Sequence, residues 1–137
     1  MRLSRETRYA ILALVELAAR PEGEVVEARR LAEATDLPAA YLSKILQSLS
    51  RAGIVDSLRG RGYTLVRSPK TVTLREVIVA VEGAGLFKEG CIFWREECSE
   101  SNPCPLHWCW RDLRPGIEQV VGRVTLSQIR EHDLVDG

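Results

Sequence analysis

The residues best suited to chemistry are four cysteines that lie close together in the last third of the chain. They are Cys91, Cys98, Cys104 and Cys109, with His107 among them, and no other cysteine occurs in the 137 residues. A hydrophobic core would distribute its cysteines over many elements. Thiolates gathered in one short segment can instead bind a soft metal ion or an iron-sulfur cluster. This segment is therefore a candidate ligand site.

The intervals between these residues discriminate among three kinds of site. Six residues separate Cys91 from Cys98, five separate Cys98 from Cys104, and two separate Cys104 from His107. Structural zinc sites usually pair ligands about two to four residues apart, a pattern that only Cys104 and His107 show. Widely spaced thiolates favour a cluster, because its iron atoms need ligands over a broader surface. The spacing predicts an iron-sulfur cluster, with zinc or a thiol-disulfide switch among Cys98, Cys104 and Cys109 as alternatives.

His107 and Cys109 compete for the position of fourth ligand. If a helix begins near residue 105, His107 lies in its first turn beside Cys104, and Cys109 projects about 160° away from His107 around the axis. This geometry favours His107 and leaves Cys109 as the alternative.

The elements that position this site belong to a chain with an uneven distribution of charge. The net charge is zero, yet residues 1–70 hold 12 Lys and Arg against 8 Asp and Glu, and residues 71–137 hold 7 against 11. Residues 37–70 carry six basic side chains and only one acidic one, Asp56. Such a local excess of positive charge is typical of a surface that follows phosphates. The N-terminal half is therefore a candidate DNA-binding region.

Three expected helices in this half outline a helix-turn-helix. Residues 5–19 repeat apolar side chains at the helical period, and a proline and a glycine follow them. A short helix over residues 28–35 is followed by a tight break and by a second helix over residues 38–53, which opens with Pro38. Two short helices joined in this way are typical of the motif.

In that motif the start of the second helix reads bases in the major groove. The residues there that lie off the apolar stripe are Ala39, Ala40, Tyr41, Ser43 and Lys44. Residues 54–66 then predict two strands around a tight RGRG turn, which makes a wing. At its tip Arg59 and Arg61 can reach a phosphate or a narrow minor groove. A protein interaction module with the same outline is the alternative for this half.

The second half predicts a helix over residues 73–83, the cysteine segment, and a long helix over residues 108–124. Thr125 and Gln128 then resemble a capping box that opens a short final helix. The long helix carries an apolar stripe of Leu113, Ile117, Val120, Val121 and Val124. A chain of this size has little left to cover that stripe, which predicts a homodimer; packing on the first helix is the alternative.

These elements give a mainly α fold with a small β-wing. We divide it into a winged helix-turn-helix DNA-binding domain over residues 1–82, a cysteine-rich cluster-binding loop over residues 83–107, and a dimerisation helix with a C-terminal tail over residues 108–137.

Several classes of protein find no support in the sequence. No stretch reaches the roughly 18 apolar residues of a membrane span, so we expect no membrane partner and a cytoplasmic protein whose thiols stay reduced. No glycine-rich phosphate loop or Ser-His-Asp set is evident, and the chain has only 2 histidines, so we expect no enzyme. A small iron-sulfur electron carrier is an alternative of a different class, but it would not need a basic helix with a wing.

Four segments of the sequence together resemble a known family. They are the opening MRLSRETRYAILALVELA, the segment LPAAYLSKILQSLSRAGIV, the turn RGRGYTL and the run CPLHWCWRDL. With them the chain resembles the Rrf family of winged-helix transcriptional regulators over nearly its whole length. The resemblance implies a homodimer whose affinity for a palindromic DNA operator is controlled by an iron-sulfur cluster that senses redox state, iron or nitric oxide.

The resemblance also implies a ligand set. In members of the IscR type, three cysteines and a histidine hold a [2Fe-2S] cluster, and these positions fall on Cys91, Cys98, Cys104 and His107. Members that sense nitric oxide add an acidic residue from near the N-terminus of the partner subunit, but this chain has Arg8 there. The IscR-type set, and a [2Fe-2S] rather than a [4Fe-4S] cluster, is therefore preferred.

The chain departs from the IscR-type pattern at four positions. Its first cysteine interval is one residue longer, and Cys109 is an additional thiol. Glu6 is an acidic alternative to the histidine ligand, close to the position of the usual one. Ser43 stands where relatives carry a glutamate in the recognition helix, so the preferred operator need not be theirs.

Overall fold

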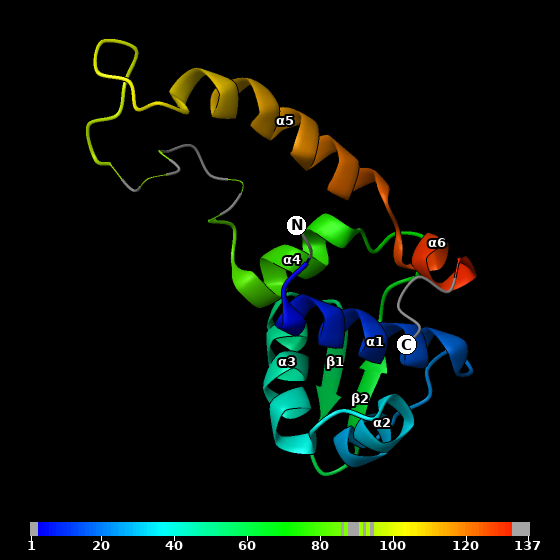
Figure 1. The fold of residues 1–137 in the computed structure, drawn as a ribbon. Coiled ribbons are helices and arrows are strands. Elements are labelled where there is room, and N and C mark those ends of the chain that lie inside the picture. The colour runs from blue at the N-terminus through cyan, green and yellow to red at the C-terminus, as the bar shows by residue number, and fades with distance from the viewer. Residues whose placement is uncertain (1–2, 86, 88–90, 92, 94, 133–137) are drawn as a thin grey trace.

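The computed structural model describes residues 3–85, 87, 91, 93 and 95–132 of the chain. Within these residues it holds six helices and two strands, namely α1 (Arg5–Ala19), α2 (Ala28–Thr35), α3 (Ala39–Arg51), β1 (Val55–Leu58), β2 (Gly62–Leu65), α4 (Leu74–Glu82), α5 (His107–Arg123) and α6 (Leu126–Glu131). In Figure 1, α1 to α4 and the strands gather into one body, and α5 passes over α4 toward the cysteine-bearing segment. The expected fold class, mainly α with a small β-wing, is confirmed.

Local sequence signals set the ends of the two helices in the helix-turn-helix. α2 ends at Asp36, whose backbone is left-handed with φ of 56°, a conformation that short polar side chains tolerate at helix ends. Pro38 was expected at the first helical position. It lies one residue earlier, as the N-cap of α3, and its carbonyl accepts a hydrogen bond from the Leu42 N–H at 2.9 Å.

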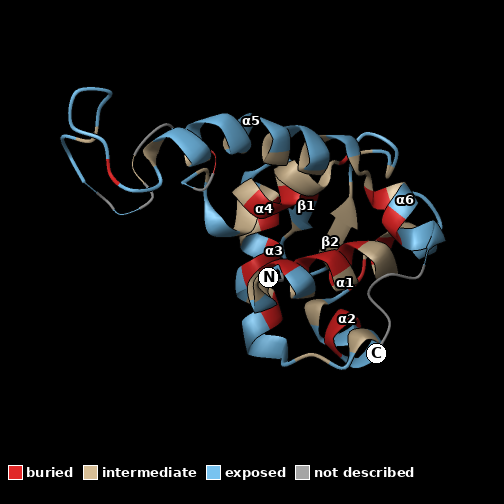
Figure 2. Ribbon diagram, turned by 45° about the horizontal axis from the view of Figure 1, so that its top comes forward, coloured by how far each residue is buried: buried red, intermediate tan, exposed pale blue. Residues whose placement is uncertain are grey.

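One apolar core holds these elements together. Its fully buried side chains include Leu14, Leu31, Leu42, Leu46, Leu49, Ile54 and Val77. Each such side chain contributes about 1.5–3 kcal/mol relative to an exposed one. Figure 2 shows buried positions on α1, α2, α4 and α6. Leu126 and Ile129 of α6 join the core, and the capping box of Thr125 and Gln128 is formed. The short final helix therefore packs on the N-terminal body.

The wing is an antiparallel hairpin that a third segment reinforces. Leu58 pairs with Gly62, so residues 59–61 form the turn. Val26, ahead of α2, exchanges two backbone hydrogen bonds of 2.8 Å with Tyr63. This close approach requires glycine at position 62, because a Cβ there would lie 2.3 Å from the carbonyl oxygen of Val26.

α5 lies against α4 and remains largely exposed. None of its residues is buried, and Leu113 and Val120 are 58% and 63% exposed. Nε and Nη2 of Arg75, on α4, donate to one carboxylate oxygen of Glu118 at 3.1 and 2.8 Å. This ion pair fastens the middle of α5 to the body of the protein.

Among the described residues, no helix combines the length and the apolar character needed to cross a lipid bilayer.

Candidate functional site

Three of the four cysteines meet at the N-terminal end of α5. The ligand atoms of Cys91, Cys98 and Cys104 all lie within 4.8 Å of one another. Cys104 is buried, the other two are half-buried, and none forms a disulfide. A bridge between Ser99 and Asn102, with hydrogen bonds of 3.1 and 3.3 Å, reverses the chain between the second and third cysteines. This reversal brings Cys98 and Cys104 close together although five residues separate them in the sequence.

His107 stands at the edge of this thiol group. Its Nδ1 lies 3.2 Å from the Sγ of Cys98, and its backbone N–H donates to the carbonyl of Cys104 at 3.1 Å. Its Nε2 is buried and has no hydrogen-bond partner within the part of the chain that the structure describes. A buried imidazole nitrogen without a partner is costly. The ring atom that faces the thiols is Nδ1, and the group of mutually close ligand atoms holds the three cysteines without His107.

The alternative fourth ligands lie elsewhere. Cys109 is exposed on α5 and outside the thiol group. Glu6, on α1, accepts a hydrogen bond of 2.5 Å from the hydroxyl of Tyr41 on α3. Neither side chain approaches the three thiols in the described part of this chain.

The thiols experience different electrostatic environments. Burial alone would raise the pKa of Cys91, but the backbone N–H groups of Arg95 and Phe93 and the neighbouring thiols outweigh it and bring this pKa to about 7. Burial raises the pKa of Cys104, and the nearby thiols of Cys91 and Cys98 raise it further. One thiol is thus prepared to ionise at neutral pH, which is what metal binding requires.

Side chains from α4 and α5 hold the cysteine segment at both of its ends. Phe87 is buried, and the guanidinium of Arg75 lies over its ring at 5.1 Å from the centroid. Near the other end, Arg111 pairs with Glu100 at 2.8 Å and lies over the ring of Trp108 at 4.6 Å. Arg75 also pairs with Glu118, so a single side chain joins α4, α5 and the segment.

The residues expected to contact DNA lie along α3 and the wing turn. Ala39, Ala40 and Lys44 are exposed at the start of α3, and Ser43 is half-buried. Arg59 and Arg61 are exposed in the turn between β1 and β2. Tyr41 is 39% exposed, and it also contacts α1, because its hydroxyl donates to Glu6 and its ring packs edge-on against Tyr9 at 5.6 Å.

A match to a protein family identifies the class of protein that carries this cysteine group and this winged helix-turn-helix. Residues 3–132 match the model of Rrf2, described as an iron-dependent transcriptional regulator. The chain belongs to the Rrf2 family of transcriptional regulators. The expected resemblance is confirmed, and the chain stands among DNA-binding regulators rather than enzymes.

Relatives of this Rrf2-family protein include regulators of different kinds. The HTH-type transcriptional regulator IscR of Yersinia pseudotuberculosis is 29% identical over 131 residues, which are 94% of this chain and 79% of that protein. CymR of B. subtilis, the global cysteine regulator, has the same fold with a TM-score of 0.75, 23% identity and coverage of 96% and 98% of the two chains. IscR of T. potens gives a TM-score of 0.70, 24% identity and coverage of 97% and 88%.

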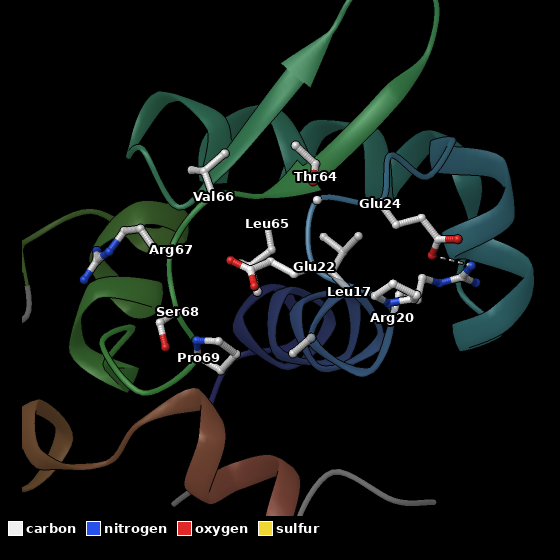
Figure 3. Close-up of a pocket in the computed structure, with 13 residues that line it drawn as sticks. Leu17, Arg20, Glu22, Glu24, Thr64, Leu65, Val66, Arg67, Ser68 and Pro69 are labelled. Atoms are coloured by element: carbon white, nitrogen blue, oxygen red, sulfur yellow. Dashed lines mark hydrogen bonds and ion pairs between the residues drawn. The ribbon is translucent and has the colours of Figure 1, made fainter.

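The Rrf2-family chain also has a cavity remote from the cysteines. It encloses about 230 Å³ between the end of α1 and the link that follows β2. In Figure 3, Arg20 and Glu24 pair at one side, and Arg67 points away at the other. None of the 13 described residues that line it is a cysteine or histidine. The cavity therefore adds nothing to the candidate metal site.

Sequence reasoning missed the side chains that tie this site to the rest of the Rrf2 fold. Arg75, Phe87 and the bond between Glu6 and Tyr41 carried no signal in the spacing of the sequence. The hydroxyl of Thr7 also donates to the Glu82 carboxylate at 2.7 Å, across 75 positions of the chain. Contacts at such separations follow from the tertiary structure and not from any local motif.

Proposed function

We propose that this Rrf2-family regulator acts in the cytoplasm as a homodimer that binds a palindromic operator, with its DNA affinity set by a [2Fe-2S] cluster. Cys91, Cys98, Cys104 and His107 would hold the cluster. The observation that carries this proposal is the meeting of three cysteine ligand atoms within 4.8 Å of one another, with Nδ1 of His107 at 3.2 Å from the Sγ of Cys98.

The donor set suits such a group. Cysteine thiolates are soft ligands that prefer iron-sulfur clusters, zinc and copper(I), and a neutral imidazole completes sites of this kind. When bound, the cluster would supply a change of oxidation state at the end of α5. The lowered pKa of Cys91, about 7, raises the fraction of this thiol that is ionised at neutral pH, and the burial of Cys104 keeps water from that side of the site.

The position of the site suggests how its state reaches DNA. His107 is the first residue of α5, and its backbone N–H donates to the carbonyl of Cys104. This hydrogen bond sets the direction in which the cysteine segment enters the helix. The exposed stripe of α5 would meet a second copy of the chain. Occupancy of the site then favours one of two dimer geometries, and with it one spacing of the two α3 helices.

A second candidate has its own support. Three free thiols within reach of one another, one with a pKa of about 7, also suit zinc binding or a disulfide switch. Both alternatives keep the winged helix-turn-helix and change only the chemistry of the sensor.

The test is anaerobic purification and reconstitution with iron and sulfide, followed by assay of iron and acid-labile sulfide per chain. We expect about two of each. Cys104→Ser should lose both, because it removes the buried thiol, whereas Cys109→Ser should retain both, because Cys109 lies exposed outside the group. His107→Ala should change the visible absorption spectrum.

Other results of the same assay would overturn this assignment. About four iron and four sulfide per chain would indicate a [4Fe-4S] cluster with a fourth ligand other than His107. One zinc without sulfide, or no metal and a disulfide after oxidation, would favour the second candidate.

A further inference from the structure

The first turn of α1 makes two side-chain bonds to other elements from adjacent residues. The carboxylate of Glu6 accepts from the hydroxyl of Tyr41, in the first turn of α3, at 2.5 Å. The hydroxyl of Thr7 donates to the carboxylate of Glu82, the last residue of α4, at 2.7 Å. One helical turn therefore touches both α3, the recognition helix of the proposed DNA-binding motif, and α4, the helix that leads into the cysteine segment.

The bond to Glu82 is required by burial. Thr7 is the only polar side chain fully buried among the described residues, with 0% of its surface exposed. A buried hydroxyl without a partner is destabilising, and a bond to a carboxylate is stronger than one between neutral groups. The end of α4 is thereby fixed against α1.

Glu82 is also the point at which the chain turns toward the thiols. Gly83 follows it with φ of 84°, ends α4, and starts the segment in which Phe87 is buried under Arg75. Phe87 lies only five residues after Glu82, so the contact between Phe87 and Arg75 holds the start of the segment close to the end of α4.

On its other side the same turn orients the start of α3. Tyr41 is 39% exposed, and its ring packs edge-on against Tyr9, one turn of α1 beyond Glu6. Ser4 caps the helix by accepting from the N–H of Thr7 at 3.1 Å, so the turn that carries both contacts is itself held in place. A shift of this turn moves Tyr41 together with the first residues of the recognition helix.

We infer that Glu6 and Thr7 are positioning residues that couple the cysteine site to the recognition helix, from Glu82 through the first turn of α1 to Tyr41. This coupling rests on the proposed function, because it requires that occupancy of the cysteine site alter DNA affinity. It gives Glu6 a role within its own chain instead of a ligand's role.

The test measures DNA affinity in the reconstituted and the metal-free protein, using a duplex that the wild-type protein has selected from a random-sequence library. Allosteric coupling typically changes affinity by about 5- to 150-fold. Thr7→Val removes the hydroxyl and keeps the shape of the side chain. We expect this variant to bind iron and sulfide like the wild type and to reduce the ratio of the two affinities to within about twofold of unity.

Thr35→Val is the matched control. Thr35 lies in α2, and its hydroxyl donates to the carbonyl of Leu31 in the same helix at 2.5 Å, so its removal breaks no contact between elements. This variant should keep the wild-type ratio. Hydrogen exchange of the first turn of α3 gives a second readout: loading the site should change it in the wild type but not in Thr7→Val.

The outcomes separate the two proposals. A wild-type ratio near unity would remove the proposed function itself. A clear wild-type ratio that Thr7→Val retains, with unchanged exchange behaviour, would overturn the coupling role alone. If Thr7→Val folds poorly, Tyr41→Phe tests the other bond of the same path, because it removes the partly exposed hydroxyl that donates to Glu6. This variant should also lower the ratio of the two affinities.

Discussion

At the scale of single residues, Lys44 offers the most direct probe of the proposed DNA face. It is exposed on α3, on the side not used by the core. If its ammonium contacts a phosphate, Lys44→Gln should weaken binding to all sequences alike. It should also make the slope of log affinity against log salt shallower by about two for the proposed dimer, or about one for each copy of Lys44. Fluorescence anisotropy titrations at several salt concentrations measure both effects.

Lys70→Gln is the control for that experiment. Lys70 is also exposed and basic, but it lies in the link between β2 and α4, beyond the opposite end of β2 from the wing turn. Its replacement should leave the slope unchanged. An unaltered slope in Lys44→Gln as well would mean that Lys44 makes no phosphate contact.

The candidate ligands were predictable residue by residue, whereas their supporting contacts were not. Residue type and clustering indicated Cys91, Cys98 and Cys104, because soft ligands are rare and all four cysteines of the chain fall within residues 91–109. Tyr41 shows the limit of this reasoning. Its place in the sequence predicted a contact with bases and did not indicate that its hydroxyl donates to Glu6, 35 positions away, because no local pattern indicates such a pair.

At the scale of elements, the link after β2 and the start of α4 are joined by an ion pair between Arg67 and Glu76. The hydrogen bond from Arg67 holds the pKa of Glu76 below its ordinary value of 4.5. The unfolded chain binds this proton more readily than the folded one. The contribution of the pair to stability is therefore present above pH 4.5 and lost as pH falls through the folded-state pKa.

Glu76→Gln should accordingly lower stability at neutral pH by about 0.5–1 kcal/mol, since the pair is partly exposed and the carboxylate lies in the first turn of a helix. Its stability should fall less steeply than that of the wild type below pH 4.5. Urea unfolding across this range measures the difference. The control is Glu33→Gln, on the exposed face of α2, whose stability should depend on pH as that of the wild type does. If all three proteins show the same dependence of stability on pH, the pair of Arg67 and Glu76 does not contribute to acid unfolding.

Elements with a strong period were predictable, and those completed by tertiary contacts were not. The helices over residues 5–19 and 28–35 and the wing followed from apolar spacing and turn residues. The bridge from Val26 to Tyr63 and the packing of α6 into the core did not. A single bridging residue has no periodicity, and six residues are too few to indicate which surface they cover.

At the scale of the whole molecule, the exposed apolar stripe on α5 requires an explanation. Leu113 and Val120 lie seven residues apart, on the same face, and are more than half exposed. If this face joins two copies, Val120→Asp would bury a charge in each half of the interface. We expect dimer dissociation to become easier by at least about 100-fold, or about 2.7 kcal/mol, as measured by sedimentation equilibrium.

Val66→Asp is the matched control, because Val66 is similarly exposed, at 52%, but lies after β2 and away from α5. It should sediment like the wild type. A wild type that is monomeric at micromolar concentration, or an unaffected Val120→Asp, would contradict the assignment of this face.

The ion pair between Arg75 and Glu118 divides α5 into a long N-terminal part and a short C-terminal part. His107 begins the helix at the thiols, and the pair of Arg75 and Glu118 fastens it 11 residues further on, or about 16 Å along the axis, leaving an arm of about 8 Å beyond it. A displacement of about 2 Å at His107 is then a rotation of about 7° about this pivot, and the far end moves by only about 1 Å. Because the two parts differ in length, a movement at the thiols displaces the C-terminal end of α5 by only about half as much. Such a movement is compatible with α6 remaining packed in the core.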